Sequence, residues 1–524
     1  MSVHYNRQFA PYVIPAGVPT DLDMVPDLAW LLRMGTAQAR AAAGELAIKV
    51  GERLPALLRQ SRAGRWLETA SGRVVELAAG RVADDGDAGF AYRRLAGMNP
   101  VTIQRVRSLA ELPPELSLSD AHLSALLGAP QTLADRLQRG DLYLLDLRAL
   151  TVAGGADLQA GKFVAPAAAL FCHAPEVDSP QPLVPLAIAC AAGAADGDLA
   201  MVTPLDGERW KLARHMLNVA DVNYGELCLH LARAHLMTTP FALALHRKLD
   251  KRHPIYEFLL PHLRFELFVA RMAWLQGVRT NQGILVRSLA GSARWSQQVA
   301  GQLWRDKSFA DQHFLRDLSA RGMADAPIDY PYRDDGMLLW QAIAELCRSY
   351  VALTYPDQAA LDGDIALHAF LCEVESTEGG NVRELLPHGK LVSLAELAEI
   401  LTQVLFVAGP FHAMLHYASA AELQHMEQSP GYLNSNPLCT GEAALPKRRA
   451  VHQFTRVMGT NARHDRLGDF SHYPLGRRAD CASLLAKFQL RLTEIEQTIE
   501  QRNRQRFAPF IHLLPSRITN GITV

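Results

Sequence analysis

The 524-residue sequence lacks the features that mark several common protein classes. It carries a net charge of −1 and has no long basic run, so its electrostatics give no reason to expect nucleic-acid binding. Its seven cysteines are scattered, odd in number and never arranged as Cys-x-x-Cys, which argues against a disulfide framework and against a thiolate zinc site. Buried free thiols in a reducing compartment are expected instead.

Apolar runs long enough to cross a bilayer are missing as well. The most apolar runs, at residues 163–171 and 183–192, fall well short of the roughly 18–20 residues that a spanning helix needs. Residues 1–17 have no basic region followed by an apolar one, so no secretory signal is expected. We therefore predict a cytoplasmic protein and leave peripheral contact with a membrane open.

Helical periodicity dominates what the sequence does contain. Long periodic stretches predict helices over residues 20–60, 208–237, 253–277, 336–355, 393–426 and 482–506. Short apolar runs bounded by Gly, Pro or Asp predict a few strands at 142–150, 163–171 and 185–191. No early block of short alternating strands is evident, so no small N-terminal β-barrel is expected. The length allows two to four ordinary domains or one large helical domain, and the pattern favours a mainly α fold with minor β content.

Histidines at fixed offsets are the most informative feature of the chain. His230 and His235 are five residues apart, which places them about 140° apart on a regular α-helix. A local π-type bulge would bring them to one face, and such bulges tend to occur at functional sites. His412 and His416 are four residues apart and share a face without distortion. Neutral imidazoles are common ligands of Fe, Mn, Zn and Cu.

The same histidines have a structural interpretation. The chain holds 19 histidines, and pairs at these spacings are usually structural or exposed. His253 and His262, at the ends of a predicted helix, could equally be capping or core residues. Four imidazoles and one carboxylate would suit an octahedral redox ion with one place left for water. The α-carboxylate of Val524, anionic at neutral pH, could provide that oxygen if the tail is buried, although nothing in the spacing singles it out.

The segment around these histidines resembles the lipoxygenase family. That family carries the pattern His-x4-His-x17-His-x8-His, matched here by His230, His235, His253 and His262, and HPIYEFLLPHLRF is close to its HPIYKLLxPHxR. The resemblance runs in family order from about residue 95 to residue 524, through residues 97–106, 142–147, 321–323, 328–336, 394–417, 467–470 and 488–503. The tail RITNGITV is similar to the family's terminal IPNSxSI.

The resemblance implies a single large helical lipoxygenase-type catalytic domain with a metal site between two central helices. Residues 1–94 would form a divergent helical extension, without the N-terminal β-barrel that plant and animal members carry. The metal would be non-heme iron, or less often manganese. Its ligands would be His230, His235, His412, His416 and the main-chain carboxylate of Val524. His253 and His262 would be structural.

The implied reaction needs no side-chain acid, base or nucleophile. A ferric ion with bound hydroxide would take a hydrogen atom from the methylene between two cis double bonds of a polyunsaturated fatty acid. The pentadienyl radical would then react with O2 and end as a hydroperoxide. The protein would supply the ion, a dry apolar channel and restricted access for O2, and we expect it to act as a monomer.

Three positions bear on the substrate. Ala273 aligns with a small-residue site that influences which end of the pentadiene takes oxygen, and Ala there accompanies S-configured products. Gly277 stands where the family usually has a bulky Leu or Ile, and Gly225 stands where most members have another histidine; a glycine there is expected to open space beside the site. These departures leave two alternatives: a related metal oxygenase acting on another polyene or a specialised metabolite, and a non-catalytic lipid-binding relative.

Overall fold

The structure is a computed structural model. It describes residues 86–152, 155–179, 181–191, 199–423, 429–446 and 465–523, together with Tyr5–Asn6, Ile14–Pro15 and six residues between positions 31 and 43. The predicted helix over 20–60 therefore lies almost wholly outside the described residues. The division into an extension at 1–94 and a family-like remainder stays a prediction for the same reason.

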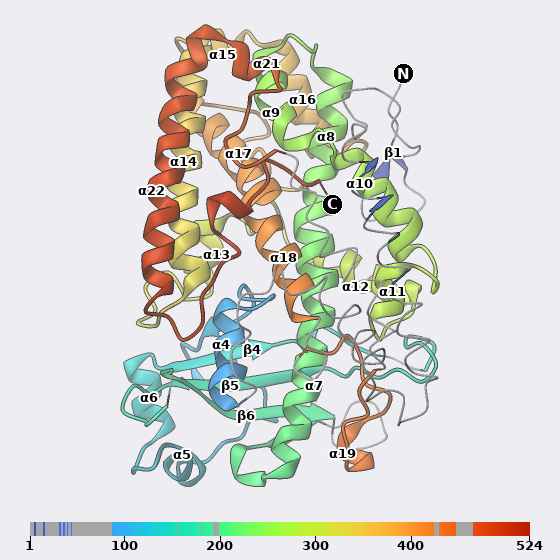
Figure 1. The fold of residues 1–524 in the computed structure, drawn as a ribbon, viewed down its shortest axis with the longest axis vertical. Coiled ribbons are helices and arrows are strands. Elements are labelled where there is room, and N and C mark those ends of the chain that lie inside the picture. The colour runs from blue at the N-terminus through green and yellow to red at the C-terminus, as the bar shows by residue number, and fades with distance from the viewer. Residues whose placement is uncertain are drawn as a thin grey trace, which may run out of the picture.

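An antiparallel sheet forms one end of the molecule (Figure 1). Its five strands follow one another in chain order: β3 (Gln104–Arg105), β4 (Leu142–Asp146), β5 (Ala167–His173), β6 (Leu183–Ala191) and β7 (Leu199–Val202). Strands β5 and β6 are buried along nearly their whole length because both faces of the sheet are covered. Side chains of α4 (Asp87–Ala96) and α7 (Glu208–Tyr224) pack on one face, and those of α5 (Asp120–Leu127) and α6 (Leu133–Arg139) pack on the other. The three predicted strand segments are confirmed.

One long helix links the sheet to the helical body. It starts as α7, continues as a π-helical segment, Gly225–His235, and ends as α8 (Leu236–Lys248). In Figure 1 it rises from the sheet through the centre of the molecule. Most of its residues are buried, so other elements cover it on nearly all sides. The helix predicted over 208–237 is thus confirmed and extends eleven residues further, to Lys248.

A second long helix packs against the first. It consists of α17 (Leu394–Phe406), a π-helical segment, Val407–Phe411, and α18 (His412–Glu422). Ser393 caps it by accepting a hydrogen bond from the backbone N–H of Glu396 at 3.1 Å. By length and composition this 29-residue helix could cross a membrane, but 78% of its most apolar window is buried inside the protein. The apolar runs selected from the sequence overlooked it, and its burial is that of a core helix.

The remaining helices enclose this pair. Two long ones, α14 (Pro331–Thr354) and α22 (Ala482–Asn503), lie side by side on one flank (Figure 1). The segment predicted as one helix over 253–277 is divided in the structure into α9 (Pro254–Leu263), α10 (Glu266–Met272) and a π-helical segment, Ala273–Val278. The other α-helices described after residue 280 are α11 (Ile284–Ser288), α12 (Ala293–Asp306), α13 (Phe314–Ala320), α15 (Gln358–Asp362), α16 (Ile365–Glu375), α19 (Pro437–Thr440) and α21 (Pro474–Arg477).

Near the N-terminus, β1 (Tyr5–Asn6) pairs with β2 (Ile14–Pro15), and β2 packs against α10 and α8. The extension expected to be helical therefore also contributes a short strand pair. All seven cysteines are free, as expected; Cys372 and Cys439 are exposed and the other five are buried. The expected mainly α fold with minor β content is confirmed.

Candidate metal centre

The π-helical segment of the first long helix brings two histidines together. His230 and His235 both lie in Gly225–His235, and their Nε2 atoms are 3.2 Å apart. On a regular α-helix the same residues would point about 140° apart. The wider π turn removes most of that angle, so the bulge predicted from the five-residue spacing is confirmed.

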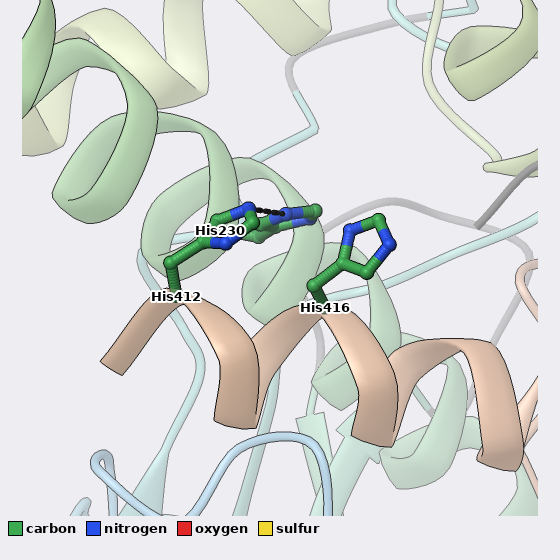
Figure 2. A group of neighbouring side chains, drawn as sticks. All are labelled: His230, His412 and His416. Carbon is green, nitrogen blue, oxygen red and sulfur yellow. Dashed lines mark hydrogen bonds between the residues drawn. The ribbon is translucent and has the colours of Figure 1, made fainter. Parts of the chain in front are cut away.

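The second long helix supplies the facing pair. His412 opens α18 and His416 follows one turn later, with ring centroids 5.3 Å apart. The Nε2 atoms of His230 and His412 lie 3.3 Å apart across the two helices. Figure 2 shows the rings of His230, His412 and His416 gathered between the two helices. One ligand atom from each of these three lies within 4.8 Å of the others, which is close enough to hold one metal ion.

His235 joins the same cluster through its neighbours. Its ring centroid is 4.9 Å from that of His230 and 4.9 Å from that of His412. All four rings are buried, with at most 7% of any residue exposed. The structure thus brings together the four histidines that the sequence analysis selected, from two helices separated by about 180 residues of chain.

The surroundings of His235 and His412 favour neutral rings. Burial, and then the neighbouring histidines, hold the pKa values of His235 and His412 well below the ordinary range for histidine. The Nε2 atom of His230 lies 3.2 Å from that of His235 and 3.3 Å from that of His412, so ring nitrogens from both helices meet in the cluster. Neutral imidazoles are ligands for first-row metals such as Fe. The residues present therefore fit a metal ion.

A carboxylate behind the cluster orients one of its rings. The Nδ1–H of His230 donates to Oε2 of Glu226 at 3.1 Å, one turn earlier on the same helix. This bond leaves the Nε2 lone pair of His230 pointing into the cluster. Glu226 is 1% exposed and was missed in the sequence analysis. Its signal was present in the sequence, namely an acidic residue four positions before a candidate ligand on a predicted helix.

The tail of the chain is folded into the interior beside α9. The backbone carbonyl of Asn520 accepts a hydrogen bond from Nδ1–H of His262 at 2.7 Å, and the Asn520 side chain donates to the carbonyl of Asp469 at 2.7 Å. Ile522 and Thr523 are 1% and 4% exposed. Val524 lies outside the described residues, so its carboxylate ligand stays a prediction.

The two other histidines of the sequence pattern hold the scaffold. His253 caps α9: its Nδ1 accepts from the backbone N–H of Ile255 at 3.2 Å, and its Nε2 bonds to the Asp364 carboxylate at 3.0 Å. His262 anchors the tail through Asn520. Their expected structural roles are confirmed.

Gly409 explains how the tail comes so close to the second long helix. It lies in the π-helical segment Val407–Phe411, and a Cβ there would come within 3.2 Å of the Thr519 carbonyl oxygen and 3.4 Å of that of Asn520. A side chain at this position would therefore push the tail away. Sequence reasoning missed this role because the contact joins segments more than 100 residues apart.

The three expected pocket positions differ in their surroundings. Gly225 begins the first π-helical segment, and a Cβ there would meet Cε of Met98 at 3.1 Å, so the expected open space is occupied. At Gly277 a Cβ would meet only Cβ of Leu285, at 3.9 Å, which leaves room for a side chain. Ala273 begins the π-helical segment that also contains Gly277. Their roles toward a substrate stay predictions.

The sequence has clear relatives. The family model described as Lipoxygenase matches residues 74–453. A linoleate 9/13-lipoxygenase from Pseudomonas aeruginosa is 32% identical over 469 residues, which are 82% of this chain and 66% of that protein. An allene oxide synthase-lipoxygenase protein from Plexaura homomalla is 27% identical over 471 residues, which are 84% of this chain and 44% of that protein. The chain thus spans less than two thirds of the length of these relatives.

Solved structures share the fold. A coral 8R-lipoxygenase superposes with a TM-score of 0.85 at 22% identity, covering 100% of this chain and 79% of the other. A manganese lipoxygenase of Gaeumannomyces graminis superposes with a TM-score of 0.78 at 19% identity, covering 98% of this chain and 94% of the other. Both likenesses concern the fold alone.

Proposed function

Because the chain belongs to the lipoxygenase family, we propose that it is a non-heme iron dioxygenase. It inserts O2 into a (Z,Z)-1,4-pentadiene of a polyunsaturated fatty acid and yields the lipid hydroperoxide, with manganese as the alternative metal. The observation that carries this proposal is the cluster of four buried histidines on two facing helices. The substrate class follows from the relatives, one of which is named for linoleate.

The ion would be held by His230, His235, His412, His416 and the main-chain carboxylate of Val524. When bound, it supplies one-electron redox chemistry for breaking the C–H bond between the two double bonds. The protein's own residues do the rest. Glu226 holds the ring of His230 in one tautomer, and burial of all four rings excludes water. The anchored tail lies with Thr519 and Asn520 against the helix that carries His412.

The overall reaction balances without a further reactant. The substrate loses one hydrogen atom from its central methylene, one C–O bond forms to O2, and that hydrogen returns as the proton and electron that complete the hydroperoxide. No side-chain acid, base or nucleophile takes part. A monomeric, cytoplasmic protein that contacts membranes at most peripherally remains our prediction.

One observation favours a second substrate class. Gly277 has space for a side chain on the segment that also carries Ala273, so a pocket lined by these residues would be wider than one closed by Leu or Ile. A bulkier polyene or a specialised metabolite would fit such a pocket. We keep this as the alternative substrate for the same metal chemistry.

Elemental analysis of the purified protein, followed by conjugated-diene absorbance with linoleate and arachidonate, tests the proposal. We expect about one iron or manganese per chain and a diene signal, both lost in His235→Ala. The exposed His472 provides a matched control, because His472→Ala should change neither. A protein that binds metal but gives no diene signal with either fatty acid would favour the alternative substrate, another polyene or a specialised metabolite. A chain that binds neither iron nor manganese would instead indicate a non-catalytic lipid-binding protein.

A further inference from the structure

Glu266 is a buried acid that the proposed chemistry does not use. It is the first residue of α10 and is 0% exposed, between that helix and α8. Its Oε1 lies 2.7 Å from Oγ1 of Thr239, on α8. Its Oε2 has no hydrogen-bond partner among the described residues. A carboxyl group in such a place needs an explanation, since burying it costs free energy.

The hydroxyl of Thr239 faces two acceptors at once. Besides Glu266, it lies 2.7 Å from the backbone carbonyl oxygen of His235. A threonine hydroxyl has a single proton to donate. Both contacts are hydrogen bonds only if Glu266 is protonated and donates to Thr239 Oγ1, which in turn donates to the His235 carbonyl.

The electrostatics agree with a protonated acid. Burial raises the pKa of Glu266 to about 8, and the hydroxyls of Thr239 and Thr238 oppose that shift. These two hydroxyls are the described neighbours that act on the group, and no charged side chain is among them. At neutral pH the chain of hydrogen bonds therefore runs from α10 through α8 to the last residue of the π-helical segment.

The carbonyl of His235 lies where the π-helical segment gives way to α8. Continuing the π pattern would require an N–H five residues later, and that residue is Pro240, which has none. Thr239 directs its hydroxyl to this oxygen at 2.7 Å, whereas Thr238 lies 3.2 Å from it but closer, at 3.0 Å, to the carbonyl oxygen of Ala234. The backbone of a candidate ligand is thus held at the junction where the π geometry ends.

We propose that Glu266 is a positioning residue, which acts through Thr239 to fix the backbone of His235 and couples α10 to the metal-bearing helix. This inference rests on the proposed function, since it takes His235 as a ligand. The coupling connects the pocket positions to the metal site. Helix α10 leads into the π-helical segment that contains Ala273 and Gly277, so a shift of α10 would be transmitted to His235 through the hydrogen bonds of Glu266 and Thr239.

Two variants separate positioning from simple packing. Glu266→Leu and Thr239→Val each remove the chain but keep apolar volume. Replacing both buried polar partners by apolar groups of similar shape is nearly neutral or stabilising for a fold, so the double variant is the reference for Tm. A merely structural role predicts unchanged metal binding and an unchanged or raised Tm of the metal-free protein. A positioning role predicts the same Tm for the metal-free protein but a faster loss of metal from the loaded protein. Glu266→Gln keeps a donor for Thr239 and should restore the unmodified behaviour.

The experiment measures the rate at which iron leaves the loaded protein into excess chelator, together with its EPR spectrum. We expect about tenfold faster release in Glu266→Leu and Thr239→Val, the lower end of what partners behind a ligand contribute. Glu266→Gln should stay within about threefold of the unmodified protein. Thr402→Val is the matched control: this buried hydroxyl donates within its own helix, to the Ala398 carbonyl at 2.6 Å, and its loss should leave release unchanged.

Raising the pH adds an independent readout. Release from the unmodified protein should accelerate above about pH 8, where Glu266 loses the proton that it donates, and Glu266→Gln should show no such rise. Unchanged release in Glu266→Leu, or equally fast release in Glu266→Gln and Glu266→Leu, would overturn the inference. If Glu266→Leu does not fold, unchanged release in Thr239→Val overturns it in the same way. An unmodified protein that holds no metal overturns the proposed function itself.

Discussion

Removing the acid behind His230 should weaken the metal centre by a predictable amount. Glu226 is buried and accepts the His230 Nδ1–H at 3.1 Å. Glu226→Gln keeps an acceptor of the same shape but removes the charge. A hydrogen bond to a charged group contributes about 1.5–3 kcal/mol and a neutral one about 0.5–1.5 kcal/mol, so the loss is about 1–1.5 kcal/mol. Since 1.36 kcal/mol is a factor of ten, the Kd for iron should rise about tenfold.

Glu226→Ala should have the larger effect. It leaves the Nδ1–H of His230 buried without a partner and frees the ring to change tautomer, which corresponds to about 10- to 100-fold in metal affinity. The assay is a competition titration of iron against a chelator of known affinity, at fixed pH. Glu496→Gln is a suitable control, because Glu496 accepts hydrogen bonds from Ser516 at 2.5 and 2.8 Å on the distant helix α22. An iron Kd in Glu226→Ala equal to that of the unmodified protein would refute the reasoning.

Three further predictions concern the tail. Gly409→Val should displace the tail, because the new side chain meets backbone oxygens at 3.2 and 3.4 Å. We expect the free energy of unfolding to fall by about 1–3 kcal/mol in chemical denaturation and the metal content to fall in elemental analysis. A normal metal content would contradict the steric argument. Adding one glycine after Val524 converts its carboxylate into an amide and should reduce iron retention by at least about tenfold; full retention and activity would remove Val524 from the ligand set. Burial lowers the pKa of His262 to about 4. Between pH 6.5 and 4 the unfolded chain therefore binds more protons than the folded one, and the metal-free protein should lose stability as the pH falls through that window. In calorimetry, His262→Phe should make stability depend less steeply on pH. It should also cost about 1–3 kcal/mol of stability at pH 7, because the Asn520 carbonyl loses its donor. A pH dependence as steep as that of the unmodified protein would contradict the role of His262.

The sequence was most informative where the metal centre requires a particular spacing between residues of one helix. The five-residue interval between His230 and His235 predicted a π bulge because no regular helix could place both rings on one ion, and the structure contains that bulge. The four-residue interval between His412 and His416 likewise predicted their shared face. Apolar runs bounded by turn residues located the strands correctly because both faces of that sheet are buried.

Long-range contacts could not be read from spacing. Nothing near Gly409 indicates that the chain's own tail passes over it, and nothing near Glu266 indicates a threonine of another helix beside it. The expected space at Gly225 is taken up by Met98, which is more than 100 residues away in the sequence. The apolar character of Leu394–Glu422 was also underestimated, since its polar residues, His412 and His416 among them, interrupt the run.

The π-helical segments within the two long helices also fix how the parts of each helix are rotated relative to one another. Before Gly225–His235, α7 packs on the sheet; after it, α8 packs on α16 and α10. Each residue of a regular helix contributes a turn of about 100° and a rise of about 1.5 Å, so deleting one residue within the segment would change the orientation and position of α8 by a comparable amount. Its core-facing side would then meet the wrong neighbours. Each segment therefore fixes the orientation of the helix that follows it and is intolerant of any change in length.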